Sequence, residues 1–128
     1  MSVLREMEQS LIGHVTGGAI IGNEASLWIQ TPGFYPTSEE MSDFVEIFDK
    51  TENELSKGIK FQNDRFLVVQ NQDGVIIAKN VFGGIILCKC ESCVVFSFIE
   101  NVRDFEEGKE VTLKLAEWIR ATPELELK

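Results

Sequence analysis

The chain has few of the residues that most catalytic and nucleic-acid sites need. Among its 128 residues there is one histidine, His14, and no serine lies in a G-x-S-x-G motif, so no nucleophile with an imidazole base is indicated. The 12 lysines and arginines are outnumbered by 21 acidic residues, and the net charge of −9 repels nucleic acid. No apolar run is long enough to span a membrane or is placed as a secretory signal. We therefore expect a cytoplasmic binding protein that is not an enzyme and needs no cofactor.

Cysteine is also scarce, and its three occurrences lie within the stretch IILCKCESC. An odd number of thiols in a reducing compartment does not predict a disulfide framework. A structural zinc site needs four ligands, and C-x-C-x2-C supplies three, with His14 far away in the sequence. In a strand, Cys88 and Cys90 would share one face and Lys89 the other. We expect Cys88, Cys90 and Cys93 to pack as small apolar side chains in the core, with no metal bound.

Length and composition predict a single domain over residues 1–128. The chain is 44% hydrophobic and 26% charged, which is typical of a globular protein with one core. No internal repeat or linker interrupts it. We expect this domain to be a monomer.

The first third of the chain predicts a helix, a hairpin and a second helix. Apolar residues at helical spacing indicate the first helix, and they are Val3, Leu4, Met7, Leu11 and Ile12. The runs VTGGAIIG and ASLWIQ, separated by Asn23 and Glu24, favour a tight hairpin. Thr37 and Glu40 can form a capping box for the second helix, whose apolar positions are Met41, Phe44, Val45 and Phe48. The polar stretch KTENELSKG ends that helix.

The remaining two thirds of the sequence predict a β-rich middle and a last helix. Between Ile59 and Ile99, short turns separate apolar runs, which favours an antiparallel meander of four strands. Gly83 and Gly84 match no phosphate-binding loop and suit a close approach of the backbone. The last helix is predicted from an apolar stripe made of Val111, Leu115, Trp118 and Ile119. This order of elements predicts an α+β fold, an antiparallel sheet covered by helices.

Three segments together resemble the profilin family. GAIIGNEASLWIQ resembles the profilin hairpin A-I-I-G-x-x-x-S-x-W-A-Q, and RFLVVQNQDGVIIAKNVFGGIILCKCESCVVFSFIE is similar to K-Y-M-V-I, I-x-G-K-K and G-G-V-x-x-x-K-T in succession. VTLKLAEWI resembles V-V-E-R-L-G-D-Y-L. The resemblance implies a central antiparallel sheet with the N- and C-terminal helices on one face and short helices on the other. It also implies a cytoskeleton-associated protein that binds monomeric actin and regulates filament assembly.

The resemblance implies an actin site on the later strands and the start of the last helix. Matching positions place there the basic residues Arg65, Lys79, Lys89 and Lys109. A proline-rich ligand site is implied at the first helix, the hairpin and the last helix, through Val3, Leu4, Met7, Trp28 and Trp118.

Several positions depart from the family pattern. The start lacks the aromatics of S-W-Q-x-Y, which indicates weak binding of proline-rich proteins. The Lys-Lys pair of the family is Lys79-Asn80 here, which indicates weak binding of phosphoinositides, and Cys90 replaces a threonine. We expect a divergent profilin, from a deeply branching eukaryote or from an archaeon with eukaryote-like cytoskeletal genes.

One alternative fits the same class of fold. A roadblock- or longin-like scaffold would dimerise through a shared sheet or bind a small GTPase, and it would need an open strand edge.

Overall fold

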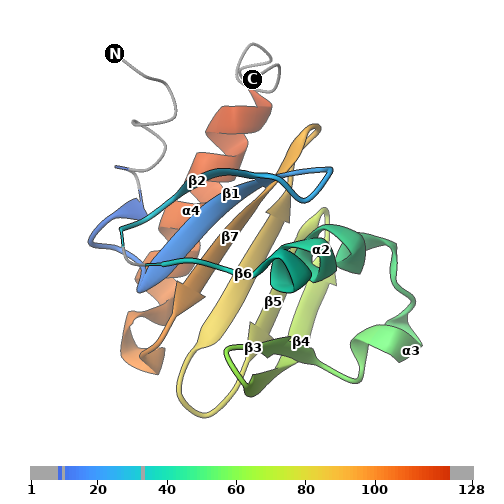
Figure 1. The fold of residues 1–128 in the computed structure, drawn as a ribbon. Coiled ribbons are helices and arrows are strands. Elements are labelled where there is room, and N and C mark those ends of the chain that lie inside the picture. Colours follow the sequence, from blue (N-terminus) through green and yellow to red (C-terminus); the bar gives the residue numbers. More distant parts are fainter. Residues whose placement is uncertain (1–8, 10, 33, 122–128) are drawn as a thin grey trace.

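The computed structural model describes residues 9, 11–32 and 34–121 of the chain. Seven antiparallel strands form one sheet in the order β2-β1-β7-β6-β5-β4-β3 (Figure 1). Their bounds are β1 Gly17–Gly22, β2 Leu27–Gln30, β3 Ile59–Phe61, β4 Asp64–Gln72, β5 Val75–Lys79, β6 Gly84–Lys89 and β7 Cys93–Ile99. The predicted α+β class and the antiparallel pairing are confirmed. The meander has five strands, not the expected four, because Ile59–Phe61 pairs with the start of β4.

Helices cover both faces of the sheet. Helix α4, Phe105–Arg120, packs on β6 and β7, and α2, Ser38–Glu46, lies on the opposite face (Figure 1). Two short 3-10 helices are Ile47–Asp49 and Val102–Asp104. The predicted first helix falls mainly on residues outside the described ones. Within the described part of the chain, no helix has both the length and the apolar character to span a bilayer.

The capping box predicted for α2 is present. The hydroxyl of Thr37 accepts from the backbone N–H of Glu40 at 3.0 Å, and the Glu40 carboxylate accepts from the N–H of Thr37 at 2.8 Å. The same pairing occurs at Thr51 and Glu54 and begins helix α3, Glu52–Leu55. The sequence predicted only that KTENELSKG ends the preceding helix, and the short helix within it was missed because its capping box went unrecognised.

The sheet separates two apolar clusters. On the α4 side, side chains of β5, β6 and β7 meet the buried positions of α4, which are Phe105, Gly108, Thr112, Leu115, Ala116 and Ile119. The predicted stripe was therefore partly wrong, since Thr112 and Ala116 are buried while Trp118 is 39% exposed. On the α2 side, Phe44 stacks on Phe96 with ring centroids 4.3 Å apart.

The three cysteines lie in the α4-side cluster. Cys88, Cys90 and Cys93 are buried, as predicted for core side chains, and none is in a disulfide. Cys88 and Cys90 face α4, while Lys89 between them belongs to the opposite face. Burial raises the pKa of the Cys88 thiol to about 12 and outweighs the nearby charge of Arg120, which lowers it.

Close backbone approach explains the glycine pair at the start of β6. A Cβ atom at Gly83 would overlap the carbonyl oxygen of Ile99, and one at Gly84 would lie 2.5 Å from the Phe105 ring. Only glycine lets the β5–β6 turn pass this close to β7 and α4.

Candidate functional site

The α4 side of the sheet is left partly open at β4. Helix α4 packs on β6 and β7, so β4, two strands further along, lies beyond it. Phe66 of β4 points to the α2 side, and therefore Arg65 and Leu67 point to the α4 side. A register shift between Val68 and Gln70 places Val69 in a bulge. We call Arg65, Leu67, Val69 and Gln70 the β4 face.

The β4 face exposes apolar side chains in the middle of a strand. Leu67 is 57% exposed and Val69 is 61% exposed. In an acidic chain, adjacent apolar side chains on a rigid strand are suited to contact with a partner. Sequence analysis missed both residues because it considered only the basic positions. The available signal was the run Leu67-Val68-Val69, which breaks the alternation expected of a half-buried strand.

Of the four predicted basic residues, Lys79 and Lys109 lie beside this surface at the start of α4. Lys79 pairs with Leu67 across β4 and β5, and its Nζ lies 4.3 Å from the centroid of the Phe105 ring. Lys109 follows Phe105 by one turn of α4 and is paired with Glu106 at 3.9 Å. The carbonyl oxygen of Arg65 lies 3.5 Å from the side-chain nitrogen of Asn80. Lys79 and Lys109 thus lie near the start of α4, whereas Arg65 lines a hollow with Asp43, Phe44 and Leu55.

Lys89 lies apart from the other three. It ends β6 near the β4–β5 turn, whereas Lys79 pairs with Gly84 at the opposite end of the same strand. Its side chain also points to the other face, where Nζ lies 5.7 Å from the centroid of the Phe48 ring. A single partner that contacts Lys79 on the β4 face would not meet the Lys89 side chain.

The predicted proline-rich site is only partly described. Val3, Leu4 and Met7 lie outside the described residues. Trp28 of β2 is half-buried and packs against the α4-side cluster. Trp118 borders a shallow hollow of about 290 Å³ along α4, together with Val111, Lys114 and Leu115.

His14 and the other possible catalytic or metal-ligating side chains do not form a candidate site among the described residues. Nδ1 of His14 lies 3.0 Å from a carboxylate oxygen of Glu107, and both side chains are exposed. Within the described residues, no group of three or more His, Cys, Asp and Glu side chains is arranged to hold a metal ion. The β4 face and its basic border are therefore the candidate functional site.

Comparisons with known proteins agree with the fold. The family model described as Profilin matches residues 4–123. The profilin of Drosophila melanogaster is 28% identical over 105 residues, covering 82% of this chain and 83% of the relative.

Solved structures of profilins have the same fold as this chain. Acanthamoeba castellanii profilin II superimposes with a TM-score of 0.81 at 21% identity, covering 94% of this chain and 98% of the other. LokiProfilin1, solved in complex with rabbit actin, gives a TM-score of 0.68 at 19% identity, with 93% and 98% coverage. Mouse profilin IIa, solved with a double repeat from the FH1 domain of mDia1, also gives 0.68 at 19% identity, with 94% and 98% coverage.

Proposed function

Because the chain belongs to the profilin family, we propose that it binds monomeric actin and regulates filament assembly through the β4 face and the start of α4. The observation that carries this proposal is the exposed pair Leu67 and Val69, with Lys79 paired to Leu67 across the sheet, in a chain of net charge −9. LokiProfilin1, a neighbour in fold, was solved bound to actin.

The arrangement has the composition of a protein-binding surface. Apolar side chains at the centre of an interface exclude water, and charged groups at its border accelerate association and select the partner. Here Leu67 and Val69 would form the centre, while Lys79 and Lys109 supply positive charge at the border. An acidic partner would be repelled by the other, acidic parts of the surface. The basic border would therefore also set the orientation in which the two proteins meet.

The alternative scaffold function is not favoured. Dimerisation through a shared sheet needs a long, regular strand edge. The edge strands here are β3 with three residues and β2 with four, and β2 pairs with β1 through a register shift. Because β3 pairs only with the first three residues of β4, the rest of β4 is also at the edge, and its bulge between Val68 and Gln70 makes that edge irregular. This short and irregular edge supports a monomer.

We also propose weaker binding of proline-rich proteins and phosphoinositides, in a cytoplasmic protein associated with the cytoskeleton that acts by binding and not by catalysis. Trp118 and the hollow beside it support a stacking contact with proline rings. Lys79 without a second adjacent lysine supports a weak contact with a phosphoinositide headgroup.

The test is a titration of this protein into polymerising actin labelled with pyrene. We expect spontaneous assembly to slow as the protein concentration rises, because monomers held in a complex do not nucleate. Binding to labelled monomers in a non-polymerising buffer should give a matching affinity. Unchanged assembly together with absent monomer binding, both for rabbit actin and for actin of the source organism, would rule out the proposal.

A further inference from the structure

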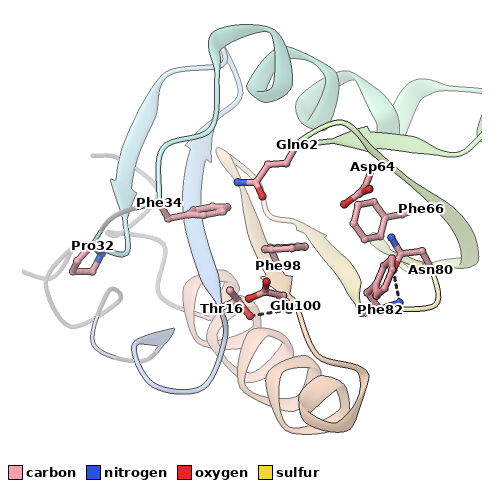
Figure 2. A pocket seen from close by; sticks show the side chains of 11 residues that line it. Thr16, Pro32, Phe34, Gln62, Asp64, Phe66, Asn80, Phe82, Phe98 and Glu100 are labelled. Carbon is pink, nitrogen blue, oxygen red and sulfur yellow. Dashed lines mark hydrogen bonds between the residues drawn. The ribbon is translucent and has the colours of Figure 1, made fainter.

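A second hollow lies on the α2 side of the sheet, away from the β4 face. It has a volume of about 390 Å³ and opens where the β3–β4 turn and the β5–β6 turn meet the end of β7 and the segment after β2 (Figure 2). Phe66 points into this side, whereas its neighbour Leu67 points to the other face. The hollow is therefore separate from the proposed actin surface.

Four phenylalanines are among the residues that line it, and one of them, Phe66, is only 2% exposed. Phe98 lies in the centre of the view in Figure 2, with Phe34 on one side of it and Phe66 on the other. Phe66 meets Phe98 edge-on, with centroids 6.1 Å apart and planes at 84°. Phe34 is only 7% exposed and stacks on Phe96 behind it. These contacts hold three of the rings in place before any ligand arrives.

The fourth ring, Phe82, is presented by a fixed turn. Its side chain is 66% exposed, which is unusual for phenylalanine. The side-chain oxygen of Asn80 accepts from the backbone N–H of Phe82 at 2.9 Å and from that of Gly83 at 3.0 Å. The turn thus holds Phe82 at the mouth of the hollow, where a bound ligand would cover it.

The charged side chains among the described residues that line the hollow are acidic. Asp64 and Glu100 line it from two sides, and no lysine or arginine is among the described residues that line it. Within residues 11–32 and 34–121, neither carboxylate is in an ion pair. The hollow would therefore repel phosphates and carboxylates, and an uncharged ligand would gain nothing from its two negative charges.

We propose that this hollow binds an organic cation, an ammonium or guanidinium group that carries apolar substituents. The faces and edges of aromatic rings accommodate the apolar groups, and ring faces attract the positive charge. Two carboxylates at the rim compensate that charge. The volume lies in the range of about 300–1,000 Å³ typical of small-ligand pockets. The cation can come from a free small molecule or from a side chain of a basic partner.

The experiment is a titration of the full chain with choline, followed by calorimetry and by NMR shifts of backbone amides. The matched probe is the uncharged analogue in which a tert-butyl group replaces trimethylammonium. We expect saturable binding of choline, shifts centred on Phe82 and Phe98, and affinity for the analogue lower by about tenfold. The double variant Asp64→Asn, Glu100→Gln should lose about tenfold in choline affinity, and Phe82→Ala should also weaken binding.

Two controls are needed. One tests whether loss of any carboxylate lowers choline affinity, and the other tests whether the cation comes from a free molecule or from a protein side chain. Asp73→Asn neutralises a carboxylate in the β4–β5 turn, away from the hollow, and should leave choline affinity unchanged. A peptide with one trimethyllysine tests the partner side chain: if it saturates the same amides while choline does not, the cation belongs to a protein. Equal affinity for choline and its uncharged analogue would overturn the proposal. So would the absence of saturable binding by both choline and the peptide.

Discussion

The ammonium group of Lys79 lies over the ring of Phe105, 4.3 Å from its centroid. Phe105 is buried and begins α4, so this contact joins the end of β5 to the start of the last helix. At the other end of α4, the Arg120 guanidinium donates to the carbonyl oxygen of Lys89 at 2.6 and 3.1 Å. The helix is thereby fixed at both ends, and Lys79 is held beside the β4 face.

Charge reversal at Lys79 should weaken actin binding. We expect Lys79→Glu to lower the affinity for actin monomers by about tenfold, mainly through slower association, because a border charge that attracted the partner would repel it. Lys89→Glu is the matched control, since the Lys89 side chain lies on the opposite face. Stopped-flow binding to labelled actin measures both variants. An equal loss in the two would contradict the assignment of the surface.

A buried hydroxyl pair should contribute measurably to stability. Oγ1 of Thr112 in α4 lies 2.7 Å from Oγ of Ser97 in β7, and both residues are fully buried. The Thr112 hydroxyl donates its one proton to the carbonyl oxygen of Gly108, also at 2.7 Å, and therefore accepts from the Ser97 hydroxyl. Thr112→Val leaves the Ser97 hydroxyl without this partner and should lower the free energy of unfolding by about 1–3 kcal/mol. The double variant with Ser97→Ala should lose less than the sum of the single variants, as measured by urea denaturation. Strict additivity would show that the two hydroxyls do not interact.

The Cys88 thiol should make stability fall at alkaline pH. Its pKa rises from 9.0 to about 12 on folding, so between these values the folded protein holds a proton that the unfolded chain has lost. The stabilising contribution is complete below the unfolded pKa and is lost as pH rises toward the folded pKa. Denaturation curves from about pH 8 to about pH 11 should show a shallower loss of stability for Cys88→Ala than for the natural sequence. Parallel slopes would contradict this prediction.

The cysteines should remain without metal. Among the described residues no group of three or more His, Cys, Asp and Glu side chains is arranged to hold a metal ion, and core packing accounts for the positions of the three buried thiols. Elemental analysis of purified protein should find no stoichiometric zinc. An equivalent of zinc that survives mild chelation would reverse this prediction.

Binding of proline peptides should be weak. Residues 1–8 contain no aromatic side chain, so fewer rings are available to stack on proline than in the family pattern. At about 1 kcal/mol for each lost ring, two missing rings lower the affinity by about tenfold or more. Titration with a peptide of about ten prolines, followed by tryptophan fluorescence, measures the affinity. Saturation at low micromolar concentration would contradict the prediction, and Trp118→Ala would then identify whether α4 carries the site.

Local patterns in the sequence were sufficient for most of the fold. The capping box at Thr37 and the alternation through Ile86, Cys88 and Lys89 depend on neighbours within a few positions, and the structure confirms both. The second capping box at Thr51 was present in the sequence but went unrecognised. Family motifs spread over the whole chain then identified the profilin fold.

The sequence by itself determined the strands, the sheet faces of the cysteines and the acidic character of the chain, because these follow from residue order and composition. Only the tertiary structure decided which side chains become neighbours. It separated Lys89 from Lys79, and it left Leu67 exposed because α4 packs mainly on β6 and β7. It also gathered Phe34, Phe82 and Phe98 into one hollow. Such neighbours come from distant parts of the chain, and the packing of helices on the sheet sets them, which no local pattern encodes.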